Sequence, residues 1–178
     1  EIVLEEGVEI VAKKGGIVDV WMSLFDLIDS KDVTIRGEGK GATLRMRRED
    51  YGKEPYRFSE HRHGINMLSA ERITIENLRI VDTGGDGIYL GESCSKGICK
   101  EGERGENGPC RDIVIRRCDC DTNHRQGISV ISAENMLIED TVLRNTLGTA
   151  PRAGIDFEPN FERNKLVNCV MRNCLVEN

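Results

Sequence analysis

A four-residue frame, Gly-Ile-x-apolar, recurs along the chain and sets its pattern of hydrophobic and polar positions. The copies are GINM, GIYL, GISV and GIDF, at residues 64–67, 87–90, 127–130 and 154–157. Side chains alternate between the two faces of a strand, so each frame predicts a short strand that buries its isoleucine and its last residue. The run LFDLI at residues 24–28 fits the same frame without the glycine.

A second apolar strand follows the frames at a fixed interval. Ile75 lies ten positions after Ile65, and Ile138 lies ten positions after Ile128. Ile88 stands 23 positions after Ile65 (88 − 65), and this step gives the length of the repeating unit. The strands of this second set are VTIRG (33–37), ITIEN (73–77), IVIRR (113–117), MLIED (136–140) and KLVNC (165–169).

Longer intervals between the frames indicate inserted loops. The isoleucines of the four frames are separated by steps of 23, 40 and 27 positions, so two steps exceed the unit, by 17 and by four. With a further excess of 17 before the first frame, we expect loops near 37–63, 91–110 and 146–151. This alignment takes Leu166 as the equivalent of Ile138. Turn-forming residues then stand seven positions after each central apolar residue: Asp82, Thr122, Asn145 and Asn173.

Short strands in a 23-residue unit predict a parallel β-solenoid, in which each unit forms one coil. Stacked coils lie about 4.8 Å apart, the spacing of strands in a sheet. A leucine-rich repeat has a similar period, but its Leu-x-x-Leu-x-Leu signature is absent. We therefore expect one all-β domain over residues 1–178, a solenoid with 23-residue coils and two long loop insertions.

The sequences GDGIYL, QGISVI, SAERITIEN and SAENMLIED resemble the coils of right-handed parallel β-helix proteins of the pectate-lyase-like superfamily. The resemblance covers nearly the whole chain from about residue 23. It implies a right-handed β-helix, a carbohydrate-active function with a polysaccharide or oligosaccharide as partner, and a secreted or periplasmic location. That superfamily includes hydrolases, lyases, epimerases and non-catalytic tail proteins, so the chemistry must be argued from the site.

Neither end of the chain shows the cap that shields a solenoid. The first residues form no amphipathic helix, and LVEN at 175–178 directly follows a strand. Unshielded coil ends expose strand edges. We expect this chain to be a segment of a longer solenoid, or to self-associate through its ends.

Composition narrows the function classes. The net charge of −6 argues against a nucleic-acid partner, and no apolar run is long enough to span a membrane. Seven cysteines are an odd number, so at least one has no disulfide partner within the chain. Cys94, Cys99 and Cys110 share a glycine-rich loop, which leaves a disulfide or, less favoured, a metal open. The other four lie in strand-like runs, where buried cysteines act as small hydrophobes.

The 23-residue register aligns polar residues on the outward face of the glycine-isoleucine strands. The position after each central apolar residue reads Asp26, Asn66, Tyr89, Ser129 and Asp156. The positions before each glycine bring all three histidines of the chain to equivalent turns beside the same sheet: His61, His63 and His124. The repeat itself demands only a turn there, so this grouping is the strongest functional signal in the sequence.

Asp156 and Glu158 are the leading catalytic candidates. Two positions apart on one strand face, their Cα atoms are about 6.6 Å apart, near the roughly 6.5–9.5 Å between the carboxylates of inverting glycosidases. One would protonate the leaving oxygen, and the other would activate water. The catalytic set is completed by His124 and Asp86. The substrate-binding candidates are His63, Asn66, Tyr89, Arg125, Arg152 and Asn160.

Several candidates also have a purely structural interpretation. Asp86 in GGDGI and His124 in TNHRQG suit ordinary turns, and Tyr89 suits a surface strand. Arg125 and Asp156 are neighbours of His124 by register, which favours a role for that histidine in the site.

Three functions remain open. A glycoside hydrolase acting through the Asp/Glu pair is the leading hypothesis. In a polysaccharide lyase or uronate epimerase, His124 or Arg125 would remove the C5 proton and Tyr89 would act as the acid. Loop 40–62, with seven basic and four acidic residues, fits the anionic substrate of such an enzyme, although a solvated loop is the commoner explanation for such charges. The third function is a non-catalytic carbohydrate-binding or structural solenoid.

The sequence predicts no cofactor and no metal site. Asp156 and Glu158 carry oxygen ligands that suit Ca²⁺, which would bridge them to a substrate carboxylate. Two carboxylates are too few for a calcium site built by the protein alone.

Overall fold

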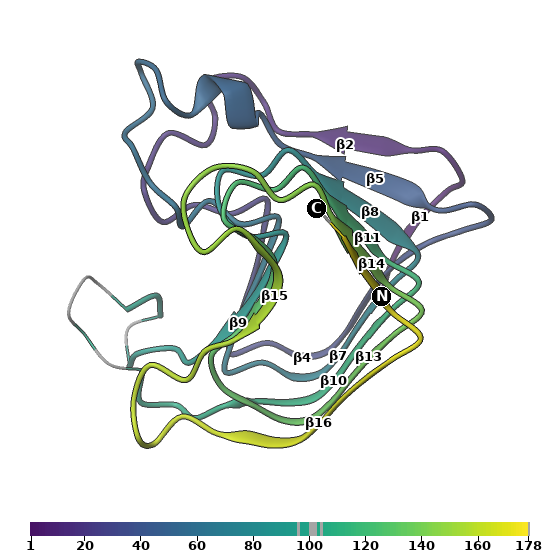
Figure 1. Cartoon of the computed structure of the whole chain (residues 1–178), viewed down its shortest axis with the longest axis vertical. Helices are drawn as coiled ribbons and strands as arrows, with labels where there is room; N and C mark the ends of the chain where they lie inside the picture. Colours follow the sequence, from purple (N-terminus) through teal and green to yellow (C-terminus); the bar gives the residue numbers. More distant parts are fainter. Residues whose placement is uncertain (96, 100–102, 104, 178) are drawn as a thin grey trace.

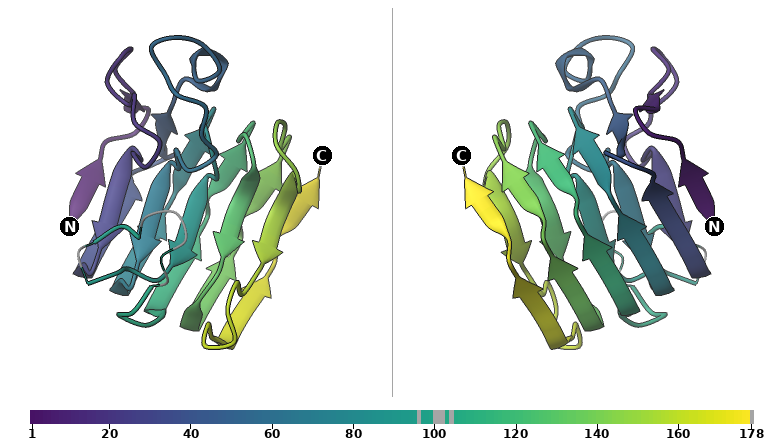
Figure 2. Two further views of the ribbon diagram at one scale, coloured as in Figure 1. Left: turned by 90° about the vertical axis from the view of Figure 1, so that its left-hand side faces the viewer. Right: turned by 90° about the vertical axis from the view of Figure 1, so that its right-hand side faces the viewer.

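The computed structural model describes residues 1–95, 97–99, 103 and 105–177. Its strands pair in parallel and form three sheets, which are the three sides of one coiled stack (Figure 1). Figure 2 shows the stack from two sides, with the N-terminal coils at one end and the C-terminal coils at the other. The predicted all-β parallel solenoid is confirmed.

Each of the first five coils contributes one strand to each sheet, and the last contributes one strand to sheet A and one to sheet B. Sheet A has the spatial order β1 (Ile2–Leu4), β4 (Lys31–Gly37), β7 (Glu71–Glu76), β10 (Cys110–Arg116), β13 (Ala133–Glu139) and β16 (Leu166–Arg172). Sheet B has the order β17 (Leu175–Glu177), β14 (Val142–Arg144), β11 (Asp119–Asp121), β8 (Leu78–Val81), β5 (Ala42–Arg45) and β2 (Glu9–Val11). Sheet C has the order β15 (Ala153–Phe157), β12 (Gln126–Val130), β9 (Ile88–Gly91), β6 (Ile65–Leu68) and β3 (Phe25–Ile28). A single 3₁₀ turn, η1 (Arg48–Asp50), is the one helical segment in the described residues.

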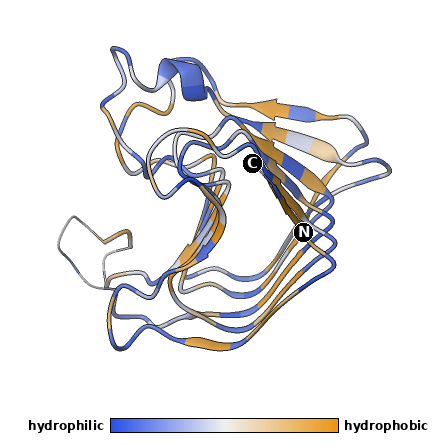
Figure 3. Ribbon diagram, viewed as in Figure 1, coloured by the Kyte–Doolittle hydropathy of each residue, from blue (hydrophilic) through white to orange (hydrophobic). Residues whose placement is uncertain are grey.

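Columns of aliphatic side chains fill the interior of the stack. Ile75, Ile115 and Ile138 pair in register across sheet A, and Ile88 and Ile128 do so across sheet C. All five are fully buried. Burying one such side chain contributes about 1.5–3 kcal/mol, so these columns are the main stabilising feature of the fold. Figure 3 shows hydrophobic residues along the strands and hydrophilic residues in η1 and in many turns.

Close approach between coils explains the glycine of each frame. A Cβ on Gly87 would lie 2.6 Å from the carbonyl oxygen of Gly127, and one on Gly127 would lie closer still to that of Gly154. Gly64 meets Gly87 in the same way, at 2.7 Å. The frame therefore begins with glycine because a side chain there would collide with the backbone of the next coil.

The two long insertions lie where the repeat places them. Ile35 pairs with Ile75 and Ile75 pairs with Ile115, and each step covers 40 positions, the 23-residue unit plus 17. The additional residues form the segments near 37–63 and 91–110.

The last coil corrects the sequence alignment. Ile138 pairs with Met171, not with Leu166, which pairs instead with Ala133. The step from Ile138 to Met171 covers 33 positions (171 − 138), five more than the 28 expected (166 − 138). Asn168 has a positive φ of 51°, as do the equivalent residues Arg72, Asp112 and Asn135 of the other sheet A strands, which confirms the register with Met171 opposite Ile138. The five additional positions lengthen the loop at 158–165.

The outermost strands leave apolar side chains exposed. Ile2 and Val3 on β1, and Val170 on β16, are 40 to 48% exposed. Self-association through these edges stays a prediction. Among the described residues, no helix has the length and apolar character to cross a membrane.

Candidate functional site

A pocket of about 490 Å³ opens on the outer face of sheet C. Its floor is built from outward side chains of β6 and β9 and from the residue after β12: Asn66, Leu68, Tyr89 and Ile131. Its walls come from the segments before β3 and β6, and from the loops near 91–110 and 158–165, which project beyond sheet C in Figure 1. The inserted loops thus turn a flat strand face into a pocket.

A row of aromatic rings lines one side of this pocket. Trp21 stacks on His61, with ring centroids 4.0 Å apart and 14° between the planes. His61 meets His63 edge-on at 6.2 Å, and His63 stacks on Tyr89 at 4.7 Å and 15°. Each contact adds to the apolar burial of the rings, so the row is a rigid wall rather than a set of independent side chains.

His63 is held in its neutral form. Burial, reinforced by the charges of His61 and Arg125, lowers its pKa well below the usual value. Its Nδ1 accepts the backbone N–H of Asp86 at 3.0 Å, which assigns the ring proton to Nε2. His63 therefore offers a hydrogen-bond donor and no positive charge.

Asp86 lies below this row and is fully buried. Burial raises the pKa of its carboxyl to about 7, although Arg125 and Ser129 both oppose the shift. Ser129 Oγ lies 2.7 Å from Asp86 Oδ2 and 2.5 Å from Gln126 Oε1, yet a hydroxyl has one hydrogen. Both contacts are satisfied when protonated Asp86 donates to Ser129, which then donates to Gln126. Gln126 Nε2 in turn donates to Asp156 Oδ2 at 3.2 Å.

Arg125 holds the carboxyl groups of this face together. Its guanidinium lies 3.4 Å from Glu158, 3.7 Å from Glu60 and 3.8 Å from Asp86. Partial burial disfavours its charge, but Asp86, Glu60 and Glu158 outweigh that effect and raise its pKa. We call Glu60, Asp86, Arg125, Asp156 and Glu158 the carboxyl cluster. It adjoins the pocket at Tyr89 and His63.

The family model described as the right-handed β-helix region matches residues 56–178. The chain belongs to the right-handed β-helix family. This family carries many functions on one fold, so membership fixes the architecture and leaves the activity to the site.

Two relatives of this β-helix come from Bacillus subtilis (strain 168). The uncharacterized protein YclG is 32% identical over 100 residues, which cover 53% of this chain and 16% of YclG. The SPbeta prophage-derived uncharacterized protein YorA is 27% identical over 101 residues, with the same two shares. The aligned region is thus a small part of each relative. No solved structure matches the chain significantly.

The predicted outward column of the β-helix is confirmed. Asn66 pairs with Tyr89, Tyr89 with Ser129, and Ser129 with Asp156. Four substrate-binding candidates line the pocket: His63, Asn66, Tyr89 and Asn160. Asp156 and Glu158 lie in the carboxyl cluster beside it.

Two candidates lie outside both the pocket lining and the carboxyl cluster. The backbone N–H of His124 donates to the carbonyl of Gly85, and its ring packs against Gly148. Burial and the charge of Arg48 lower the pKa of His124. Arg152 is exposed, and its Nε donates to Gly148 O at 2.6 Å. The register places both residues correctly at the edge of sheet C, and both contact Gly148 in the turn at 147–149.

Several pocket residues were not among the sequence candidates: Trp21, Glu92, Phe161 and Asn164. Their segments fall outside the 23-residue unit, so the repeat assigns them no position. The only usable signal was Trp21, the one tryptophan of the chain. The five additional positions in the last coil bring Phe161 and Asn164 to the pocket, and the sequence alignment had missed that insertion.

The cysteine question is settled by a disulfide. Cys94 and Cys99 are bonded to each other, and Cys99 lines the pocket. Cys110 is a buried free thiol, and burial raises its pKa to about 12. Within the described residues, no group of three or more His, Cys, Asp or Glu side chains is placed to hold a metal ion.

Proposed function

We propose that the outer face of sheet C binds an oligosaccharide and that the protein hydrolyses a glycosidic bond there. The observation that carries this proposal is the junction of the aromatic pocket with the carboxyl cluster, at Tyr89 and His63. Flat aromatic walls with a few polar groups suit the faces and hydroxyls of a sugar. Paired carboxyl groups are the usual catalytic residues of glycoside hydrolases.

Asp86 is the proposed acid of this reaction. With a pKa of about 7 it keeps a proton near neutral pH, the property a general acid needs. Arg125 covers it, so a bound sugar must displace the guanidinium toward Glu60 and Glu158, which already flank it. The proton of Asp86 then passes to the glycosidic oxygen as the bond to the sugar carbon breaks.

Glu158 is the proposed base. It is partly exposed and follows β15 directly, on the same side of sheet C as Asp156. It would take a proton from the water that attacks the sugar carbon. Asp156, tied to Gln126, keeps that end of the cluster in place. The proposal therefore pairs Glu158 with Asp86, while the sequence alone had favoured Asp156 as its partner.

A screen of neutral and acidic polysaccharides tests this proposal. Hydrolysis releases new reducing ends without the ultraviolet absorbance of an unsaturated uronate, whereas a lyase produces that absorbance. We expect Glu158→Gln to lower kcat by roughly 10²–10⁴, with folding intact by thermal melting. Reducing ends produced at the wild-type rate by Glu158→Gln would contradict the proposal.

A glycan-binding solenoid without turnover is the second candidate. The full burial of Asp86 beneath Arg125 favours it, because a catalytic acid must reach its substrate. One relative is described as prophage-derived, a setting in which a binding role without turnover is reasonable. This candidate predicts that oligosaccharides bind, that no polysaccharide in the screen is cleaved, and that changes in the carboxyl cluster alter affinity alone.

A further inference from the structure

Glu92 is a second carboxylate of the pocket, outside the carboxyl cluster. It directly follows β9, lines the pocket, and has a side chain that is 6% exposed. Ser132 Oγ donates to its Oε1 at 2.7 Å. Arg163 Nε lies 3.7 Å from its Oε2, which is an ion pair but too long for a hydrogen bond.

The acceptor capacity of Glu92 exceeds the bonds that the described residues supply. An ionised carboxylate has about four lone-pair sites. In the described part of the chain, Ser132 is its one donor within hydrogen-bond distance. A ligand that donates to the remaining lone pairs gains a charge-assisted hydrogen bond. The side chain therefore provides a specific point of attachment in a pocket with an apolar floor.

Arg163 holds Glu92 between two walls of the pocket. It donates to the carbonyl of Gly105 in one loop and lies over the ring of Phe161 in its own loop, 5.9 Å from the centroid. These contacts turn the guanidinium away from an ideal pairing with Glu92. The carboxylate is thus oriented by Ser132 and Arg163 and still open to a donor from the pocket.

The cationic loop at 40–62 does not supply the pocket with positive charge. Arg45 pairs with Glu9 and Asp82 on sheet B. Arg62 is buried against Tyr51 and donates to backbone carbonyls. None of the seven basic residues of this loop lines the pocket, so the excess of positive charge that favoured an anionic substrate in the sequence lies elsewhere.

We infer that the pocket selects a sugar unit that presents hydrogen-bond donors to Glu92, either the hydroxyls of a neutral sugar or the ammonium of an amino sugar, over a uronate. This inference rests on the proposed function. A carboxylate accepts hydrogen bonds and donates none, and a uronate would bring a like charge against Glu92. Glu92 is then the specificity-determining residue of the site.

The test measures binding of three tetrasaccharides by calorimetry: cellotetraose (neutral), the glucosamine tetramer (cationic) and tetragalacturonate (anionic). We expect the neutral or the cationic ligand to bind at least tenfold more tightly than tetragalacturonate. Glu92→Gln keeps the shape and the bond from Ser132, and it should weaken the preferred ligand by roughly tenfold and narrow the gap to tetragalacturonate. Glu106→Gln, an exposed residue of the same loop, is the matched control and should change affinity less than about twofold.

The outcomes separate the inference from the proposed function. Tetragalacturonate binding as tightly as both other ligands would overturn the inference and leave the oligosaccharide site standing. If Glu92→Gln folds and binds the three ligands in the same order of affinity as wild type, the inference is also overturned and the oligosaccharide site still stands. If none of the three ligands binds, the inference and the proposed function both fail. Should Glu92→Gln not fold, the wild-type ranking of the three ligands decides the matter by itself.

Discussion

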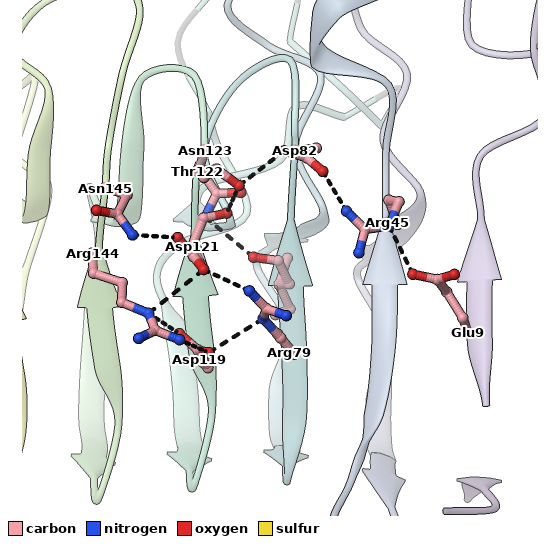
Figure 4. A network of polar contacts seen from close by, with 11 residues as sticks. Glu9, Arg45, Arg79, Asp82, Asp119, Asp121, Thr122, Asn123, Arg144 and Asn145 are labelled. Carbon is pink, nitrogen blue, oxygen red and sulfur yellow. Dashed lines mark hydrogen bonds and ion pairs between the residues drawn. The ribbon is translucent and has the colours of Figure 1, made fainter. Parts of the chain in front are cut away.

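The outer faces of sheets B and C carry similar charged residues, but the surroundings of these residues differ. On sheet B, arginines and carboxylates alternate across neighbouring coils (Figure 4). Arg144 pairs with Asp119 at 2.7 Å, and Arg79 pairs with Asp121 at 2.7 Å. On sheet C, Arg125 is the one arginine among three carboxyl groups, and Asp86 is fully buried. Both faces come from the same 23-residue unit.

The hydrogen-bond donors around each carboxylate make the difference. Burial opposes the charge of Asp121, which is only 5% exposed, but hydrogen bonds from Asn145 and Arg79 lower its pKa. At Asp86 burial dominates and raises the pKa to about 7. A buried carboxylate with enough cationic donors stays charged, whereas one with too few changes its protonation instead. On sheet B these residues therefore form ion pairs within the fold, whereas on sheet C a carboxyl group with a raised pKa is suited to proton transfer.

The largest expected difference between the faces is in turnover. Asp86→Asn removes the proposed acid while keeping the shape of its protonated form, so kcat should fall by roughly 10²–10⁴. Asp119→Asn on sheet B should leave kcat within about twofold of wild type. Release of reducing ends from the substrate found in the screen measures both. Equal activity of the two variants would mean that sheet C has no catalytic role.

Protonation of Asp86 should make stability depend on pH. Its pKa is raised from 3.8 to about 7, so the folded state binds its proton more tightly than the unfolded state. The resulting stability is complete below about pH 4 and is lost as the pH rises to about 7, by at most about 4 kcal/mol. Urea unfolding from pH 4.5 to 7.5 should show this slope in wild type and a flatter one in Asp86→Asn. Parallel slopes in the two proteins would refute the assigned proton.

Removing one arginine from each face should give the next largest effect on stability. Arg125→Ala leaves ionised Asp86 buried without its cation, which should destabilise the protein by about 1–3 kcal/mol at pH 8 and by less at pH 5. Arg144→Ala breaks exposed pairs and should cost about 1 kcal/mol or less at both pH values. Denaturant melts of the two variants at both pH values give this comparison. A loss for Arg144→Ala as large as that for Arg125→Ala would erase the distinction.

Salt should produce the smallest effect. Raising NaCl from 0.1 to 1 M shortens the screening length from about 10 to about 3 Å. The cost of Arg144→Ala should then shrink toward zero, whereas that of Arg125→Ala should change by less than about 0.5 kcal/mol because its partners are partly covered. Repeating the denaturant melts at both NaCl concentrations checks this.

Local pattern was enough to predict the fold. Contacts between equivalent positions of adjacent coils explain the isoleucine columns and the glycine of each frame. Comparison of neighbouring units in the sequence reveals these positions and the two long insertions. The last coil is the exception. The additional residues in the loop at 158–165 displace its strand along the sequence, so a second register, with Leu166 opposite Ile138, fitted the pattern equally well.

The candidate site could be predicted only in part. Tyr89, Ser129 and Asp156 were aligned correctly because they stand on strands. Trp21 and Glu92 were not found because loop residues have no register. Their positions depend on how each loop packs over its neighbours, and those contacts join residues far apart in the chain.

The stretch Gly154 to Asn160 illustrates which features the sequence determines and which only the folded structure decides. Its sequence determined the strand, the outward direction of Asp156 and the place of that residue beside Ser129, since a two-residue alternation and a 23-residue repeat leave little freedom. The tertiary structure alone decided that Glu158 pairs with Arg125 and that burial raises the pKa of Asp86 to about 7. Burial and charge pairing arise from segments that meet only in the folded chain, and these long-range terms set the chemistry of the site.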